Sequence, residues 1–346
     1  MKTIITGGAG FIGSNAASRY LRRGDQVVIV DNLCREGVQK NLDWLRPQGD
    51  LEFVRLDTRD ANGLVALFRR HKDANQVLHL AAQVAVTTSV TAPREDFEVN
   101  ALGTFNVLEA MREAAIDVPI LYSSTNKVYG EMTDVGVVEK NGRYAYRSLP
   151  NGVSEDRNLD FHSPYGCSKG SADQYVIDYH RIYGLKTVVF RQSCIYGYRQ
   201  FGAEDQGWIA WFMIASLLDR PITVYGDGKQ VRDILFIDDL LNAYDAAFAA
   251  GDRAFGKAYN IGGGPENVLS LLELLAYIEK RRNGKLPHTY SNWRPGDQKV
   301  FVSDISRAKS ELGWMPKTSC PQGLEMLYNW ISQNKSLFVE PAKAIA

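Results

Sequence analysis

Short apolar segments alternate with amphipathic segments through the first half of the chain. Six apolar segments have the length and boundaries of buried strands: 2–6, 26–30, 51–56, 76–80, 119–123 and 187–190. Between them the pattern predicts helices over 15–21, 40–45, 61–71, 93–115 and 163–183. Strands that alternate with helices predict an α/β fold built on a doubly wound, parallel sheet.

The pattern changes near residue 197, where the segments become shorter. It predicts helices over 208–218, 237–249 and 269–282, and strands over 222–225 and 258–261. The expected division is a first domain over 1–190 with returning segments at about 230–255, a smaller, discontinuous α+β domain over 191–334, and a fraying tail over 335–346. The long loops 131–162 and 198–207 are expected to have a function, because structureless loops of this length are otherwise uncommon.

The composition excludes several classes of protein. Among 346 residues, 45% are hydrophobic and 23% charged, as in ordinary globular proteins. Lys and Arg together number 40, as do Asp and Glu, so no cationic surplus favours nucleic acid or an anionic membrane surface. No apolar run approaches the roughly 20 residues of a membrane span. Because the first strand begins at residue 2, we expect no signal peptide and a cytoplasmic location.

The cysteines are scattered through the sequence. Cys34, Cys167, Cys194 and Cys320 show neither zinc-ligand spacing nor a disulfide framework. We therefore expect free thiols and no metal site.

The turn after the first strand carries three evenly spaced glycines. Gly7, Gly10 and Gly13 would allow a tight turn, close approach of a pyrophosphate, and packing of helix on strand. The N-terminus of the helix that follows offers N–H donors to the phosphates. Asp31 ends the second strand, where its carboxylate can accept hydrogen bonds from the adenosine ribose and would repel a 2′-phosphate. The arrangement predicts a Rossmann-type domain that binds NAD rather than NADP.

Ligands of such sheets bind at the carboxyl ends of the strands. Further contacts with the cofactor are therefore expected from residues at or near these ends: Phe11, Ile12, Asn32, Asp57, Thr58, Leu80, Ala81, Ala82, Gln83, Asn100, Ser123 and Gln192. Asp57 could accept from the adenine amino group or cap the next helix, and both interpretations stay open.

Tyr165 and Lys169 lie one turn apart in the predicted helix 163–183, so both project from one face. A phenol beside a fixed ammonium is expected to lose its proton more easily. The phenolate could then take a proton from a sugar hydroxyl while the carbon gives up a hydride.

Several motifs, in this order, resemble the extended short-chain dehydrogenase/reductases that modify nucleotide sugars. They are TGGAGFIG at 6–13, LAA at 80–82, YSST at 122–125, VYG at 128–130, PYGCSK at 164–169, VRDILFIDD at 231–239, YNIGG at 259–263 and RPGD at 294–297. The resemblance covers about residues 2–332. It implies that Tyr165 is the base, that Lys169 lowers its pKa and holds the nicotinamide ribose, and that Thr125 bonds the reacting hydroxyl. It also implies that Arg232 and Arg294 grip a substrate diphosphate.

The position after Thr125 distinguishes activities within this family. Dehydratases carry Asp-Glu there, whereas this chain has Asn126 and Lys127, so elimination of water lacks its two carboxylates. Because Asp31 also disfavours an NADPH-dependent reductase, an epimerase that keeps NAD bound is expected.

Segments 123–130, 160–170 and 199–208 most resemble the CDP-hexose 2-epimerases of the family. The resemblance implies inversion at C2 of a CDP-hexose, of paratose/tyvelose or glucose type, through a 2-keto intermediate. Spacing alone does not separate C2 from C4. A UDP-sugar 4-epimerase and a non-catalytic nucleotide-sugar-binding protein therefore remain alternatives.

Further substrate contacts are expected from residues near the predicted active site: Asn126, Lys127, His162, Ser193, Gln206, Trp208 and Asp297. Residues 206–208 could bond or stack the cytosine. The resemblance implies that the helices predicted over 93–115 and 163–183 form a four-helix contact, as is common in this family, and therefore a homodimer or homotetramer.

Overall fold

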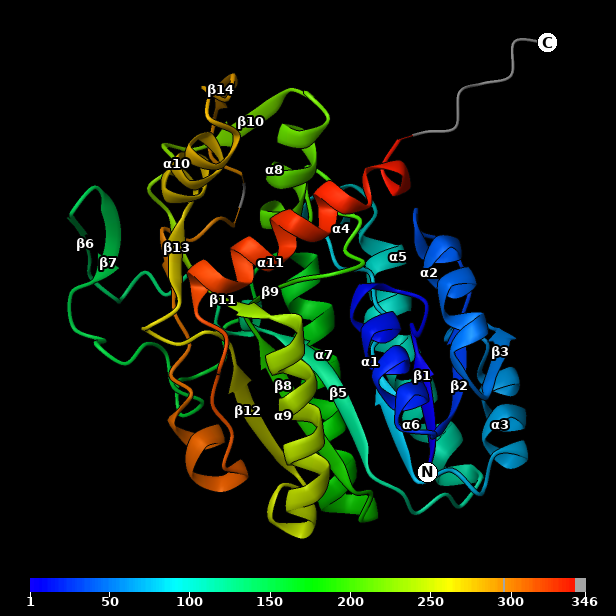
Figure 1. Cartoon of the computed structure of the whole chain (residues 1–346). Helices are drawn as coiled ribbons and strands as arrows, with labels where there is room; N and C mark the ends of the chain where they lie inside the picture. The colour runs from blue at the N-terminus through cyan, green and yellow to red at the C-terminus, as the bar shows by residue number, and fades with distance from the viewer. Residues whose placement is uncertain (295, 340–346) are drawn as a thin grey trace.

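A computed structural model describes residues 1–294 and 296–339. Its centre is a parallel sheet of seven strands in the order β12-β8-β5-β4-β1-β2-β3 (Figure 1). Their bounds are β1 (Lys2–Thr6), β2 (Gln26–Asp31), β3 (Leu51–Arg55), β4 (Gln76–His79), β5 (Ile120–Thr125), β8 (Thr187–Gln192) and β12 (Lys257–Ile261). The predicted doubly wound α/β fold is confirmed.

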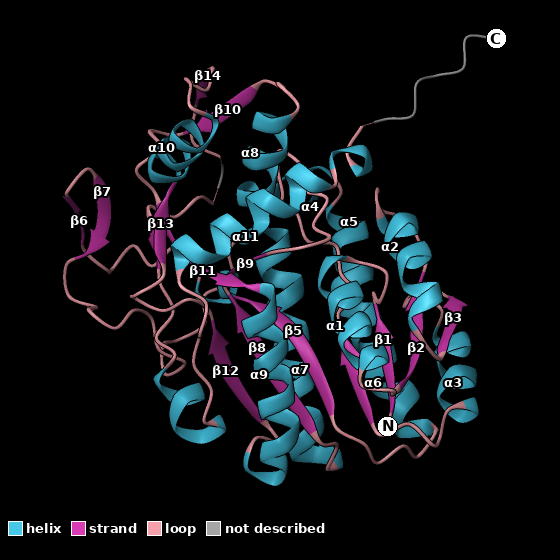
Figure 2. Ribbon diagram, viewed as in Figure 1, coloured by secondary structure: helices cyan, strands magenta, loops and turns pink. Residues whose placement is uncertain are grey.

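Helices cover both faces of this sheet (Figure 2). Ile5 packs in a core with α1 (Phe11–Arg22), α2 (Val38–Leu45) and α9 (Ile237–Ala250), whereas its neighbour Ile4 packs in a second core on the opposite face. The second core is closed by α3 (Ala61–Arg70), α6 (Gly103–Glu113) and α7 (Ser163–Tyr183). Adjacent residues of a strand face opposite ways, so burial on both faces explains why these strands read as continuous apolar runs.

The helix predicted over 93–115 is interrupted. The structure has α4 (Val86–Thr91), α5 (Pro93–Phe97), a π-helical turn at Glu98–Leu102 and then α6. The turn brings the side chain of Asn100 to the segment after β4, where it accepts from Gln83 N (2.9 Å) and donates to Gln83 O (3.0 Å). The predicted helix is thus confirmed over residues 93–113, and the sequence pattern missed only the π-helical turn within it.

The smaller part of the molecule lies beyond the carboxyl ends of the large sheet. It contains a four-stranded sheet of β9 (Cys194–Tyr196), β11 (Val231–Phe236), β13 (Val268–Ser270) and β15 (Val300–Phe301). The parallel pair β10 (Ile222–Tyr225) and β14 (His288–Ser291) and the helices α8 (Trp208–Leu217), α10 (Leu271–Arg282) and α11 (Cys320–Gln333) complete it. The domain boundaries given above remain predictions.

The long segment 131–162 is not a plain loop. It contains a hairpin of β6 (Val137–Lys140) and β7 (Arg143–Tyr146), whose Tyr144 hydroxyl donates to Asp227 (2.6 Å). Tyr146 donates to Val300 O at 3.0 Å, which ties the hairpin to β15. The hairpin was missed although the sequence carries its turn signal, since Asn141 and Gly142 both have the positive φ (+53° and +76°) that a two-residue hairpin turn requires.

The expected fraying from residue 335 is wrong for residues 335–339. A short 3₁₀ helix spans Lys335–Leu337, and buried Phe338 packs against Phe201 and Trp330. The rest of the predicted tail, 340–346, lies outside the described residues. Within the described ranges, no helix is long and apolar enough to cross a membrane.

Candidate active site

The glycine turn after β1 is closely packed. Gly7 has a φ of +68°, and a Cβ added there would lie 2.7 Å from Ala81 N. A Cβ at Gly13 would overlap the Gly7 carbonyl oxygen. α1 begins directly after Gly10 with neither a side-chain cap nor an acidic residue in its first turn. Its first N–H groups, at Phe11, Ile12 and Gly13, therefore have no competing anion and fit a pyrophosphate.

Asp31 lies beside this turn at the end of β2. Its carboxylate accepts from Ala9 N (3.0 Å) and Leu33 N (2.8 Å), which fixes its orientation. Burial raises the pKa of Asp31, and these two backbone hydrogen bonds act in the opposite direction. A carboxylate held in this place fits the ribose hydroxyls of a dinucleotide.

Asp57 does not cap the helix that follows it; its carboxylate pairs with Arg59 instead. Arg59 donates to both carboxylate oxygens (2.9 and 2.8 Å) and Asn32 donates to one (2.8 Å), and the hydrogen bonds from Arg59 are the largest cause that lowers the pKa of Asp57. The N-cap of α3 is Asp60, which accepts from Gly63 N. The capping interpretation of Asp57 is therefore wrong, and its contact with adenine remains a prediction.

The other expected cofactor residues named here lie along the same edge of the sheet, but the side chain of Gln192 points away from the cleft. Thr58, Leu80, Ala81, Ala82 and Gln83 come directly after β3 and β4, and Ser123 lies near the end of β5. Gln192 ends β8, but its Nε2 donates to the Tyr244 hydroxyl (3.1 Å) in the core. Its amide nitrogen is thus already bonded away from the cleft.

Thr125, Tyr165 and Lys169 meet where β5 ends against the first turns of α7. Thr125 and Tyr165 line one cavity, and all three side chains are buried. The ammonium of Lys169 donates to Ser123 O (2.5 Å) and lies 4.3 Å from the centre of the Tyr122 ring. The structure therefore brings the three expected catalytic side chains together.

The protonation of Tyr165 differs from the expectation. Burial raises its pKa to about 12, and the Thr125 hydroxyl offsets only part of this. Burial also lowers the pKa of Lys169 to about 7, against the effect of Asp173 and Asp96. Loss of water is the largest cause for both pKa shifts, and the Lys169 ammonium donates to the Ser123 carbonyl rather than to the Tyr165 hydroxyl.

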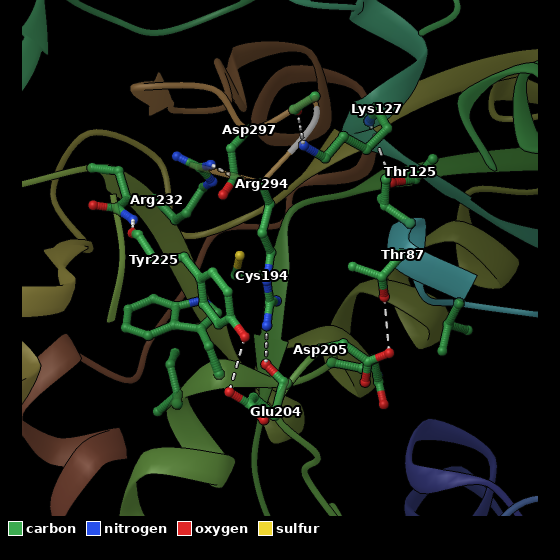
Figure 3. Close-up of a pocket in the computed structure, with 18 of the residues that line it drawn as sticks. Thr87, Thr125, Lys127, Cys194, Glu204, Asp205, Tyr225, Arg232, Arg294 and Asp297 are labelled. Carbon is green, nitrogen blue, oxygen red and sulfur yellow. Dashed lines mark hydrogen bonds and ion pairs between the residues drawn. The ribbon is translucent and has the colours of Figure 1, made fainter. Parts of the chain in front are cut away.

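A cavity of about 460 Å³ opens beside Tyr165 (Figure 3). This is a usual volume for a small-molecule site. Nine expected substrate residues line it: Thr125, Asn126, Lys127, Ser193, Gln206, Trp208, Arg232, Arg294 and Asp297. Pro295, in the predicted motif 294–297, lies outside the described residues.

Three cationic side chains converge on this cavity. Buried Arg232 donates to Val231 O (2.8 Å) and lies 3.8 Å from Asp297. Lys127 donates to Gly296 O (3.1 Å), and burial followed by the charge of Arg232 lowers its pKa to about 8. Arg294 stacks 3.8 Å from the centre of the Tyr225 ring. Asp297 and Glu131 raise the pKa of Lys127, but the charge of Arg232 lowers it, so a diphosphate bound here would relieve the repulsion between Arg232 and Lys127.

His162 does not join the site. Its exposed ring lies beside Glu131 (3.4 Å) and Asp160 (3.3 Å), just before α7 begins. The expected substrate contact of His162 is therefore not supported, because the helix start turns this residue to the surface. Conversely, Thr87 and Tyr225 line the cavity without having been predicted, since their segments meet it only in the tertiary structure.

Among the residues that the structure describes, no group of three or more His, Cys, Asp or Glu side chains could hold a metal ion. The four cysteines are free thiols.

Comparison with known proteins identifies the family. Residues 4–327 match the model of the family described as GDP-mannose 4,6 dehydratase. A Salmonella typhi protein named CDP-paratose 2-epimerase is 46% identical over 96% of this chain and 99% of its own length. A putative UDP-glucose 4-epimerase of Methanocaldococcus jannaschii is 33% identical over 96% of this chain and 98% of its own.

A solved structure of UDP-glucuronic acid 4-epimerase from Bacillus cereus, in complex with UDP-glucuronic acid and NAD, has a TM-score of 0.82 and 29% identity. The alignment covers 96% of this chain and all of that one. The chain therefore belongs to the extended short-chain dehydrogenase/reductase family of nucleotide-sugar epimerases and dehydratases, as its sequence predicted.

Proposed function

We propose that the protein is an epimerase that inverts C2 of a CDP-hexose, of paratose/tyvelose or glucose type, through a 2-keto intermediate. The observation that carries the reaction type is the cavity that joins Thr125 and Tyr165 to three cations. Asn126 and Lys127 stand where a dehydratase would need two carboxylates. The near full-length similarity to a relative named CDP-paratose 2-epimerase supports C2 and the cytidine nucleotide.

The cofactor is NAD, as predicted. Solved relatives of the family are complexes with NAD. In this chain the first turn of α1 has donors free for the pyrophosphate, and Asp31 is fixed beside the glycine turn. NADP does not fit as well, since its 2′-phosphate would meet the Asp31 carboxylate.

Side chains of this protein transfer the proton of the reacting sugar hydroxyl and orient that hydroxyl. Bound NAD supplies the acceptor that takes a hydride from the sugar carbon and gives it back. As a phenolate, Tyr165 takes the hydroxyl proton when the ketone forms, and as a phenol it returns that proton when the alcohol is restored. Because burial raises the pKa of Tyr165, the phenolate would need the positive charges of bound NAD and of Lys169 beside it. Thr125 is placed to orient the reacting hydroxyl.

Inversion requires the sugar to present its other face before the hydride returns. We infer that Arg232 and Arg294 hold the diphosphate while the sugar turns, because guanidinium groups bind phosphate oxygens through paired hydrogen bonds. The remaining volume of the cavity would let the hexose turn about its bonds to the diphosphate.

A UDP-sugar 4-epimerase is the second candidate, and a specific observation favours it. The Methanocaldococcus jannaschii relative and the Bacillus cereus structure carry that type of name. A non-catalytic nucleotide-sugar-binding protein is less favoured, because such a protein has no need of the buried set Thr125, Tyr165 and Lys169.

The test is a substrate panel that varies nucleotide and sugar separately. Purified protein should interconvert the C2 epimers of CDP-glucose or CDP-paratose without added NAD, as followed by NMR. Inversion of C4 on UDP-glucose with no C2 inversion on any CDP-sugar would contradict the proposal.

We propose that the protein forms a homodimer, or a tetramer built from it, through α7 and its neighbours. Large apolar side chains are exposed here: Phe97, Leu102, Tyr175, Ile182 and Tyr183. Tyr175 and Ile182 lie two turns apart on one face of α7, and Phe105 of α6 packs against Tyr175. A patch of this kind is typical of an interface between subunits.

A double variant, Tyr175→Glu with Ile182→Glu, is expected to shift the protein to monomer, because charges would be buried unpaired in the contact. Sedimentation velocity measures this. Met315→Glu, at an exposed apolar side chain elsewhere, is the matched control. An unchanged mass for the double variant, or a monomeric parent, would contradict the proposed surface.

A further inference from the structure

A tight turn lies at the mouth of the cavity between α8 and the segment after β9. Two backbone hydrogen bonds join Ala203 and Gln206, at 2.9 and 3.0 Å. Gly207 follows with a φ of +76°, and a Cβ added at Gly202 would lie 2.6 Å from Trp211 N. The turn is thus packed against α8 at Gly202 and leads into α8 through Gly207. We call residues 203–206 the latch turn.

Three consecutive residues of the latch turn bond three separate parts of the molecule. Gln206 Oε1 accepts from Arg35 (2.8 Å), in the segment after β2. Asp205 accepts from the Thr87 hydroxyl of α4 (2.9 Å), as Figure 3 shows.

Glu204 forms hydrogen bonds with two residues that line the proposed substrate cavity. Its carboxylate accepts from the Tyr225 hydroxyl (3.0 Å), and its carbonyl oxygen accepts from Arg294 (2.9 Å) (Figure 3). The guanidinium that is expected to grip the diphosphate is therefore bonded to the same turn that reaches Arg35 and Thr87.

The partners of Asp205 and Gln206 flank the expected cofactor cleft. Thr87 follows the segment 81–83, and Arg35 follows Asp31. Part of the Arg35 side chain is exposed, yet crowding by neighbouring atoms lowers its pKa, while Asp205, Asp31 and Tyr165 act in the opposite direction. The charges of Asp31 and Tyr165 thus act on the Arg35 guanidinium, whose hydrogen bond to Gln206 joins the segment after β2 to the latch turn.

We propose that the latch turn closes over the bound dinucleotide, and that the Arg35–Gln206 and Thr87–Asp205 hydrogen bonds slow its release. Because the Glu204 carbonyl accepts from Arg294, the same closure positions the Arg294 guanidinium to bind the substrate diphosphate. The proposal rests on the proposed use of NAD. Both hydrogen bonds are exposed, so each stabilises the closed turn only modestly and the turn can open when the cofactor exchanges.

The test measures how fast NAD bound to the purified protein exchanges with deuterium-labelled NAD, by mass spectrometry of the released nucleotide. Arg35→Met and Gln206→Met should each speed exchange about two- to fivefold, the range for an exposed charge-assisted bond. Their double variant should be no faster than either single one, because both remove the same bond. Thr87→Val should act independently, so its effect should multiply with that of Gln206→Met.

Arg181→Met, which removes an exposed arginine on α7 paired with Asp178, is the matched control and should leave exchange unchanged. Unchanged exchange in the Gln206 and Thr87 variants would overturn the latch. So would faster exchange in Arg35→Met but not in Gln206→Met, since Arg35 would then act by touching the dinucleotide directly. A parent protein that binds no NAD would instead overturn the proposed function itself.

Discussion

Replacement of Tyr165 by phenylalanine is expected to lower kcat by about 10²–10⁴-fold, the usual contribution of general acid–base catalysis. The phenyl ring keeps the packing of the buried side chain and removes only the hydroxyl that carries the proton. The protein should still hold its NAD, because the glycine turn and Asp31 are untouched. Initial rates on the active CDP-hexose, together with NAD released on denaturation, measure both properties.

Thr125→Val serves as a graded comparison for this variant, since it removes a hydroxyl from the same cavity without removing the proposed proton carrier. Its loss of kcat should be smaller. Retained turnover in Tyr165→Phe would exclude the acid–base role, and loss of NAD would show that the hydroxyl serves cofactor binding instead.

Arg232→Met is expected to raise KM for the nucleotide sugar about 10- to 100-fold, with a smaller change in kcat. The reason is that a charge-assisted hydrogen bond contributes about 1.5–3 kcal/mol, and the diphosphate is bound equally in ground and transition states. Steady-state kinetics separate the two constants.

Arg232→Lys is the matched control, because it keeps the charge and loses the planar fork. Its KM should lie between those of the parent and Arg232→Met. Thermal unfolding of each variant checks that the buried site still packs. A fall in kcat at unchanged KM would show that Arg232 acts on the chemical step rather than on the diphosphate.

The sequence predicted the large sheet well, because its strands are buried on both faces and separated by clear turn signals. The register that brings Thr6, Asp31, Thr125 and Gln192 to the ends of their strands follows from that topology. The expected substrate residues near those ends, such as Asn126 and Ser193, consequently line one cavity.

What the sequence missed depends on contacts between distant segments. The π-helical turn at Glu98–Leu102 forms where Asn100 meets Gln83. The hairpin 137–146 is an exception, because its turn residues Asn141 and Gly142 are a hairpin signal in the sequence itself. The direction of the Tyr165 pKa was missed for a related reason, because spacing shows a neighbouring Lys169 but not how much water both groups lose.

The segment 198–207 was partly predicted and partly missed. Its length predicted a function, but not that Arg35, in a segment far away in the sequence, would bond Gln206. That bond bears on the expected substrate contact of Gln206, because its amide oxygen already accepts from Arg35.

The most direct test of the account is to follow epimerisation of the CDP-hexose in D₂O by NMR. If the hydride leaves C2 and returns to the same carbon, the C2 epimer should accumulate without solvent deuterium at C2. Deuterium at C2 would show that a proton exchanges with water, and inversion at another carbon would show that C2 is not the reacting centre; either result would contradict the account.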